Sequence, residues 1–319
     1  MDVVGVGALN IDLLYEVSSL RFGGVELSPG SKTYGTEEMF HELIAEMGRH
    51  GRLVGRSGGG SAANTAYALS RMGYETAFLG VVGKDEEGAF ILGSMEGVDL
   101  SRVKKHKHSG KCLSLLADGD RSLLVLPNAN NMFSYTEDDI DFLNSSKFVH
   151  MSSFASDAAL ASQKMLMEYL DDRVYVSFSP GELYARRGVE QLEPILERTR
   201  ILFVNEQELG LLTGEMSSDG ARALLDSGPR VVVCTLGGDG SLIVSRNSEI
   251  AIPAKRTVVK DATGAGDVYA AGFLAGYLDG ANLGVCGKIA SAAAALSVAF
   301  PGREGYPDER FLRRFAKEL

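Results

Sequence analysis

The chain has 319 residues, of which 45% are hydrophobic and 23% charged, a balance typical of a globular protein with a substantial buried core. Its formal net charge of −10 and its lack of a long basic tract argue against a nucleic-acid partner. The N-terminus has no signal-peptide pattern, and the longest weakly polar run, 289–300, is too short to span a bilayer. Cys112, Cys234 and Cys286 have no disulfide or metal spacing, so we expect buried thiols in the cytoplasm.

Apolar runs alternate with helix-period segments along most of the chain. Buried strands are predicted at residues 2–7, 76–82, 147–151, 174–178, 201–204 and 231–235. Helices are predicted at residues 62–72, 157–169, 206–213, 219–226, 268–278 and 288–299. This alternation predicts an α/β fold in which helices cover both faces of a mostly parallel sheet.

Two regions, 13–34 and 111–126, fall outside the alternation. Both contain strand-like residues, and the second is interrupted by a hairpin signal at Asp118, Gly119 and Asp120. We expect a small antiparallel sheet that projects from the main one. Residues 36–47 predict an additional amphipathic helix with Thr36 as its N-cap. No linker or repeat divides the chain, which favours a single domain over residues 1–319.

A glycine-rich turn at 261–267 precedes the predicted helix at 268–278. Gly264 and Gly266 would let an anion approach the backbone closely, and the N–H groups of Ala265, Gly266 and Asp267 would favour negative charge. A carboxylate beside an anion site suggests a general base, so Asp267 is the candidate catalytic residue. The alternative is that Asp267 only complements the helix N-terminus and the glycines only pack against the sheet.

Residues 261–267 resemble the GAGD signature of the PfkB/ribokinase family of carbohydrate and nucleoside kinases. Residues 59–73 and 82–88 are similar to the family's N-terminal signature, and the order of the motifs matches over essentially the whole chain. One departure is Ala262, where the family often has threonine. The resemblance implies a three-layer α/β/α sandwich with a small β-sheet lid, formed here by about 13–34 and 111–126. It also implies ATP and Mg²⁺ as cofactors.

Asn10 and Asp12 follow the first predicted strand, where open α/β sheets bind ligands, and both are candidates to bind the hydroxyls of the substrate. A dinucleotide fingerprint does not fit, because Asn10 occupies the third glycine position and strand-like residues follow. An Asx turn is the structural alternative. The triple glycine at 58–60 would let a small ligand lie against the backbone. The resemblance implies that Asp12, Gly59, Gly60 and Asn64 bind the substrate hydroxyls, whereas the local alternative is a loop capped by Ser61.

Asn205 and Glu208 follow the predicted strand 201–204 and are three residues apart. Taken alone, they predict an ordinary N-cap with a capping box. The resemblance implies that Glu208 organises Mg²⁺ through water and that Asn205 lies near the phosphates and the metal, an environment of sparse oxygen ligands that suits Mg²⁺.

The assignment of the remaining residues to the nucleotide site depends mainly on the resemblance. Residues 235–241 form a glycine hairpin by local pattern, and the resemblance places Thr235, Gly237 and Gly240 at the nucleotide. Ser291 takes the position of an adenine-contacting residue, with small-residue helix packing as the alternative. A monovalent cation is implied near Asp261.

These features predict a cytoplasmic kinase that phosphorylates a sugar of the ribose, fructose or sugar-acid type. A nucleoside kinase is the main alternative, and a non-catalytic sugar-binding regulator ranks below both. Period-two spacing predicts that one face of the small sheet carries Leu113, Leu115, Leu123 and Val125 and the other carries Leu116, Leu124 and Leu126. With apolar residues on both faces, we expect a homodimer through the lid. The alternative is a monomer whose lid is covered by the segment from Phe22 to Pro29.

Overall fold

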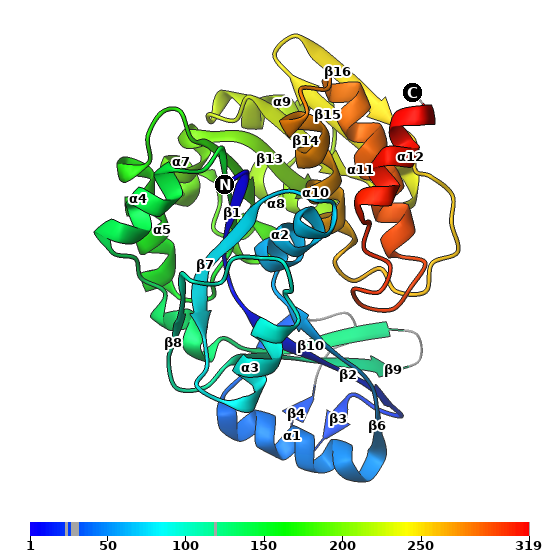
Figure 1. The fold of residues 1–319 in the computed structure, drawn as a ribbon. Coiled ribbons are helices and arrows are strands. Elements are labelled where there is room, and N and C mark those ends of the chain that lie inside the picture. The colour runs from blue at the N-terminus through cyan, green and yellow to red at the C-terminus, as the bar shows by residue number, and fades with distance from the viewer. Residues whose placement is uncertain (23–24, 27–31, 118–119, 319) are drawn as a thin grey trace.

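The computed structural model describes residues 1–22, 25–26, 32–117 and 120–318, and two sheets organise them (Figure 1). The larger sheet has nine strands in the order β16-β15-β14-β13-β12-β11-β1-β7-β8. In chain order these are β1 (Val3–Val6), β7 (Thr76–Val82), β8 (Val103–Lys105), β11 (Phe148–Ser152), β12 (Tyr175–Ser179), β13 (Thr199–Asn205), β14 (Val231–Thr235), β15 (Ser241–Ser245) and β16 (Ser248–Ile252). Only β15 and β16 join antiparallel, so the predicted mostly parallel sheet is confirmed.

Helices cover both faces of this sheet. They are α2 (Ser61–Arg71), α3 (Glu86–Gly93), α4 (Glu137–Asn144), α5 (Asp157–Tyr169), α6 (Gly181–Ala185), α7 (Val189–Arg198), α8 (Glu206–Thr213), α9 (Ser218–Asp226), α10 (Ala265–Leu278), α11 (Leu283–Ser297) and α12 (Glu309–Glu318). Short 3₁₀ turns lie at η1 (Asn128–Met132) and η2 (Gly237–Asp239). None of these described helices has both the length and the apolar character needed to cross a membrane.

The period-two alternation of the strands creates two separate cores. In β13, Leu202 and Val204 face the core formed with α4, α5 and α7 to α9. Ile201 and Phe203 face the opposite core, formed with α2, α10 and α11. The two cores make the α/β/α sandwich, and both bury nearly continuous apolar strands, as expected for a parallel sheet.

The smaller sheet has five strands in the order β5-β10-β9-β2-β6. They are β2 (Asn10–Val17), β5 (Lys32–Tyr34), β6 (Gly51–Gly59), β9 (Gly110–Ala117) and β10 (Asp120–Leu126). The pairs β2–β6 and β9–β10 are antiparallel, whereas β2–β9 and β10–β5 are parallel. The sheet is therefore mixed, and the prediction of an antiparallel sheet was wrong in this respect. A separate pair is formed by β3 (Arg21–Phe22) and β4 (Val25–Glu26).

Two expectations fall partly on residues outside the described ranges. The hairpin turn predicted at 118–120 includes 118–119, and the covering segment predicted from Phe22 to Pro29 includes 23–24 and 27–29. The strands on either side of the predicted turn, β9 and β10, do pair antiparallel.

The predicted amphipathic helix is confirmed as α1 (Glu37–His50), and Thr36 caps it by accepting the Met39 N–H at 3.3 Å. Phe40, Leu43 and Met47 pack against one face of the five-stranded sheet. That face carries Leu113, Leu115, Leu124 and Leu126. The sequence analysis had grouped residues 113 and 115 with 123 and 125, but the register pairs Leu113 with Leu124. A shift of one residue exchanges the faces of a strand, and only the pairing reveals it.

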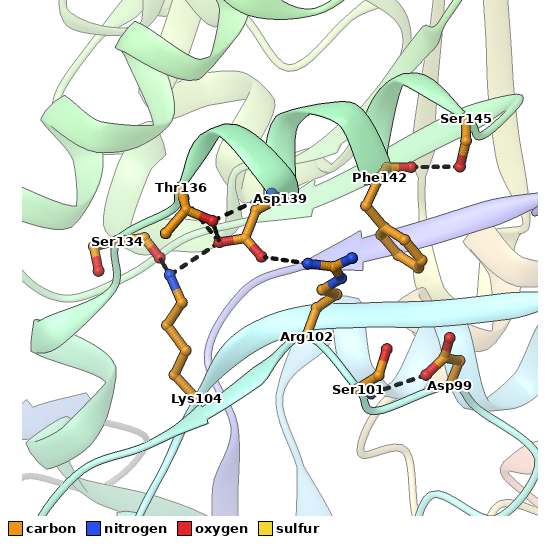
Figure 2. Close-up of polar contacts among 9 residues, drawn as sticks. All are labelled: Asp99, Ser101, Arg102, Lys104, Ser134, Thr136, Asp139, Phe142 and Ser145. Carbon is orange, nitrogen blue, oxygen red and sulfur yellow. Dashed lines mark hydrogen bonds and ion pairs between the residues drawn. The ribbon is translucent and has the colours of Figure 1, made fainter.

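A charged cluster fastens β8 to α4 (Figure 2). Asp139, which is 3% exposed, accepts hydrogen bonds at its carboxylate from the Thr136 N–H and hydroxyl at 2.8 and 2.9 Å. Lys104 Nζ lies 2.9 Å and Arg102 Nη1 3.7 Å from the same carboxylate. The cluster satisfies a buried charge with a complete capping box and two cations.

Candidate active site

The carboxylate of Asp267 lies in the first turn of α10, immediately after Gly264. Gly264 has φ 73°, a left-handed conformation that favours glycine and turns the chain into the helix. The Ser61 hydroxyl donates to Asp267 Oδ1 at 2.7 Å, and Asn64 Nδ2 donates to Asp267 Oδ2 at 2.8 Å. Ser61 therefore does not cap its own helix, since the cap position of α2 is Gly60 and has no side chain. The two family-like glycine motifs, about two hundred residues apart in sequence, meet at this carboxylate.

The protonation of Asp267 is shifted by its surroundings. Desolvation by burial raises its pKa to about 6, although hydrogen bonds from Ser61 and Asn64 and the charge of Arg303 act in the opposite direction. The side chain keeps part of its surface exposed toward a cavity. A carboxylate with a pKa near 6 can accept a proton effectively around neutral pH.

Backbone donors surround the start of α10. The Ala265 N–H donates to the Ala262 carbonyl at 3.2 Å. Among the described residues, no protein acceptor is hydrogen-bonded to the N–H groups of Gly266 and Asp267. A Cβ on Gly266 would meet nothing within 4 Å, so this face is open. These two donors, at the positive end of a helix, can bind an anion.

A cavity of about 230 Å³ opens beside these donors and gathers many of the predicted residues. Those on its wall are Asn205, Glu208, Thr235, Gly264, Ala265, Gly266 and Asp267. Asn205 and Glu208 also form a complete capping box, in which the Asn205 N–H donates to Glu208 Oε2 at 3.1 Å and the Glu208 N–H donates to Asn205 Oδ1 at 2.8 Å. The local interpretation as a helix cap is therefore correct, and the cap faces the same cavity as Asp267. We name this space the phosphate cavity.

A second cavity, of about 520 Å³, lies on the other side of Asn64. Its wall includes Asp12, Asn64 and Tyr67, together with Arg303 and Asp261. We name it the acceptor cavity. Asn64 lines this cavity and also donates to Asp267, so the candidate base, on the wall of the phosphate cavity, is one hydrogen bond away from the lining of the acceptor cavity.

Predicted glycines shape the acceptor side. A Cβ on Gly59 would come within 2.1 Å of Asp12 Oδ2, so only glycine leaves room for that carboxylate. Gly60 has φ 119°, and a Cβ there would approach the Ala8 carbonyl oxygen to 2.0 Å. Gly58 and Gly59 belong to β6, paired with β2, and not to a loop as expected from their composition.

Asn10 has a different environment from the one predicted. Its Oδ1 accepts Asn130 Nδ2 at 2.9 Å, and Asn130 also bonds the backbone N–H and carbonyl of Leu9 at 2.8 and 3.0 Å. Asn10 is not among the residues that line either cavity. Asn130, in η1, was not predicted as a site residue; it holds the chain between β1 and β2 in the position that presents Asp12.

The predicted nucleotide residues lie in two places. Thr235 lines the phosphate cavity, and Gly237 and Gly240 follow it with φ 56° and 101° in the turn around η2. Ser291 does not line either cavity. Its hydroxyl accepts the Lys255 N–H and donates to the Pro253 carbonyl, both at 3.1 Å, so it fastens the segment after β16 to α11.

Asp261 and Arg303 connect the loops around the acceptor cavity. Asp261 accepts the Thr263 N–H at 2.9 Å and the Gly302 N–H at 3.0 Å. Arg303 Nε and Nη2 donate to Asn64 Oδ1 at 3.1 and 2.9 Å, while Nη1 donates to the carbonyl and hydroxyl of Ser94, each at 3.1 Å. Sequence reasoning did not identify Arg303, because nothing local connects it to a residue 239 positions earlier.

The residues present fit a magnesium ion held mainly by water and phosphate. Within the described ranges, no group of three or more histidine, cysteine or acidic side chains could hold a metal on its own. Glu208 and Asp267 do bring two carboxylates to the wall of one cavity. Mg²⁺ commonly binds through one or two carboxylates together with substrate phosphates and retains several waters.

Comparisons with known proteins identify the family of this chain. Residues 33–305 match the pfkB family carbohydrate kinases. An uncharacterized sugar kinase of Archaeoglobus fulgidus is 36% identical, over 75% of this chain and 98% of its own. A nucleoside kinase of Methanothermobacter thermautotrophicus is 33% identical, over 77% and 80%. A ribokinase of Arabidopsis thaliana, solved with ribose and ATP, shares the fold with a TM-score of 0.82 at 24% identity, over 99% of this chain and 98% of that one. The chain belongs to the pfkB family of carbohydrate kinases.

Proposed function

We propose that this kinase transfers the γ-phosphoryl group of ATP to a hydroxyl of a sugar, with Asp267 as the general base. The observation that carries the proposal is the position of the Asp267 carboxylate. The carboxylate is fixed by Ser61 and Asn64 and lies on the wall of the cavity lined by helix N-terminal donors. Through Asn64 it is joined to the cavity lined by Asp12. A hydroxyl bound in the acceptor cavity would then reach both the base and the phosphoryl group.

Each residue of the site has its own role in the proposed transfer. Asp12 and Asn64 orient the acceptor, and Asp267 takes the proton from its hydroxyl as the oxygen attacks phosphorus. The Gly266 and Asp267 N–H groups lie where negative charge develops on the moving phosphoryl group. The bond from the γ-phosphorus to its bridging oxygen breaks, and ADP leaves with that oxygen.

We propose that Glu208 and Asn205 lie on the magnesium side of the site. When bound, the ion neutralises charge on the β- and γ-phosphate oxygens. Glu208 would orient its water ligands, as the position of its carboxylate on the phosphate cavity supports. A monovalent cation near Asp261 belongs to the same proposal, although both oxygens of that carboxylate already accept backbone N–H groups.

The nucleoside kinase remains the second candidate, supported by the nucleoside kinase among the relatives. A coupled assay that follows ADP release separates the two. Its acceptors are ribose, fructose, a keto-deoxy sugar acid, adenosine, cytidine and inosine. We expect the highest kcat/KM for a member of the sugar group. Turnover confined to the nucleosides would replace the proposed acceptor class, and no turnover of any acceptor would favour the non-catalytic regulator.

We further propose that the five-stranded sheet is a lid over the acceptor cavity and that it forms a homodimer interface. Leu14 from β2 and Val54 from β6 line the cavity, which supports the first part. α1 covers one apolar face of the sheet, so only the remaining face and edge are available for a partner. Among the described residues, the thiols of Cys112, Cys234 and Cys286 form no disulfide, which fits the proposed cytoplasmic location.

A further inference from the structure

Arginine side chains line the acceptor cavity in unusual number for an acidic protein. Arg56 of β6, Arg71 of α2 and Arg303 all lie on its wall. The same wall carries the carboxylates of Asp12, Asp261 and Glu304, so its formal charge is balanced. What a ligand would meet therefore depends on which of the guanidinium groups are already paired within the protein.

Two of these arginines, Arg56 and Arg71, have no carboxylate partner among the residues that the structure describes. Arg56 lies over the Phe90 ring of α3, with its guanidinium carbon 4.0 Å from the ring centroid. In the described part of the chain, neither Arg56 nor Arg71 makes a hydrogen bond or an ion pair. Arginines elsewhere on the surface commonly do, as Arg52 does with Glu16 and Arg222 with Glu249. A guanidinium that lines a cavity without a partner is well suited to an anionic ligand.

Among the described residues, no carboxylate on the same wall forms an ion pair with Arg56 or Arg71. Asp261 accepts two backbone N–H groups, and Asp12 has the position of the hydroxyl ligand. Glu304 is exposed. The positive groups instead gather around α2 and α3, where Arg303 bonds Ser94 and lies 5.0 Å from the Tyr67 ring centroid.

The arrangement along α2 gives the acceptor a direction. Asn64, Tyr67 and Arg71 are three and four residues apart, so they share one face of the helix. Asn64 contacts the base, and Arg71 lies two turns further, about 10 Å along the axis. An acceptor that places a hydroxyl at Asp267 would therefore direct its far end toward the arginines.

We infer that the preferred acceptor is an anionic sugar, which carries a phosphate or carboxylate group distant from the hydroxyl that is phosphorylated. Arg56 and Arg71 bind that group, and the charge of Arg303 adds to the attraction. The inference rests on the proposed kinase function and specifies its substrate class.

The test compares acceptors in matched neutral and charged pairs at saturating ATP and magnesium. Ribose is paired with ribose 1-phosphate and ribose 5-phosphate, fructose with fructose 1-phosphate and fructose 6-phosphate, and 3-deoxyfructose with 2-keto-3-deoxygluconate, which has a carboxylate in place of the C1 hydroxymethyl group. We expect kcat/KM at least about tenfold higher for the charged member of one pair, the factor given by one charge-assisted contact. The phosphate and carboxylate pairs show which anion is recognised.

Variants then connect the preference to the arginines. Arg56→Gln and Arg71→Gln should each raise KM for the charged acceptor about tenfold, with a much smaller effect on its neutral partner. Arg52→Gln is the matched control, because Arg52 lies on the same strand but pairs with Glu16 away from the cavity. Equal kcat/KM for neutral and charged acceptors, or equal effects of the three variants, would overturn the inference.

A binding measurement separates this inference from the kinase proposal. Calorimetric titration of the sugar phosphates and the sugar acid, without ATP, should show binding that Arg56→Gln weakens. Efficient phosphorylation of neutral sugars alone would retain the kinase and overturn the anionic acceptor. Absence of both turnover and anion binding would overturn both.

Discussion

At the scale of single residues, the site depends on where one proton is accepted. Asp267→Asn keeps the shape of the side chain and removes its basicity. We expect kcat to fall on the order of 10²–10⁴-fold, with nucleotide affinity retained. Steady-state kinetics measures kcat, and calorimetric titration with ATP measures the nucleotide affinity. Activity within a few-fold of the wild type would remove Asp267 from the role of base.

The raised pKa of Asp267 also predicts a pH dependence. The base must be deprotonated, and burial raises its pKa to about 6, so kcat/KM should be full above this value and decline as the pH falls through it. The measurement is a pH–rate profile in buffers of constant ionic strength. An acidic limb near pH 4, the ordinary range of an aspartate, would contradict the environment described here.

Arg303 should affect the pH of this acidic limb although it does not contact the reacting atoms. Its charge lowers the pKa of Asp267, and its two hydrogen bonds to Asn64 Oδ1 direct the Asn64 amide N–H toward the carboxylate. Arg303→Met should therefore move the acidic limb to higher pH and lower kcat. Arg303→Lys keeps the charge but not the paired hydrogen bonds, and we expect it to restore the limb more than the rate. A loss of rate with an unmoved limb in both variants would indicate a purely structural role.

Among the secondary-structure elements, two capping boxes allow a matched comparison. Glu208→Gln keeps an acceptor for the Asn205 N–H, since glutamine also serves at this position of a capping box. We expect thermal stability to change little while the magnesium concentration for half-maximal activity rises about tenfold. An unchanged magnesium requirement would leave the Asn205–Glu208 pair as a helix cap only.

The other capping box, at Asp139, should show the reverse behaviour. Burial tends to raise the pKa of Asp139, but hydrogen bonds from Lys104 and Thr136 outweigh it and hold the pKa below its usual range. A depressed folded pKa stabilises the fold above the unfolded value near 3.9, and that stability is lost as the pH falls through the folded value. Asp139→Asn should cost about 1–3 kcal/mol of unfolding free energy at pH 7 and leave magnesium dependence unchanged. Urea denaturation at pH 7 and pH 3 measures the stability loss and its pH dependence, and a magnesium titration of the activity measures the second effect. Equal stability losses at the two pH values would contradict the depressed pKa.

The elements show which parts of the fold can be predicted from sequence. Several predicted elements end where their periodicity ends, because regular packing buries one or both of their faces. These are the strands at 76–82 and 231–235 and the helices at 157–169 and 206–213. The strand β6 was missed because four of its nine residues are glycine, which is depleted in strands. It exists because β2 supplies the ladder, a pairing that local composition does not encode.

The same division holds at the site. The family resemblance implied that Asp267, Asn64 and Glu208 belong to one site, and the structure places all three around two adjoining cavities. The hydrogen bond from Ser61, the contact of Asn130 with Asn10 and the chain from Ser94 through Arg303 to Asn64 were not predicted. Each of these contacts joins residues that are 120 to 239 positions apart in the sequence, so no local pattern indicates it. Ser61 also has an ordinary local interpretation as a helix cap.

At the scale of the whole molecule, the question is which surface of the five-stranded sheet is available for contact with a second copy of the chain. α1 covers the face that carries Leu113 and Leu124, which removes half of the apolar surface on which the dimer was predicted. The nine-residue strand β6 ends the sheet on one side, and Leu53 on it is 50% exposed. An edge strand with exposed apolar side chains can pair with a second copy, although Arg52 and Arg56 on the same strand oppose unspecific pairing.

We therefore expect a homodimer whose two-fold axis lies at the five-stranded sheet, and Leu53→Glu should convert it to a monomer. The introduced carboxylates would face each other across an isologous interface, where each change is counted twice and two like charges lose their hydration. Met165→Glu is the control, since Met165 is 53% exposed but lies on α5, away from this sheet. Light scattering during size exclusion at micromolar protein gives the mass of each variant. A wild-type monomer, with or without acceptor and ATP, would reject the dimer and leave the proposed chemistry at Asp267 intact, because every contact to that carboxylate described above comes from a single chain.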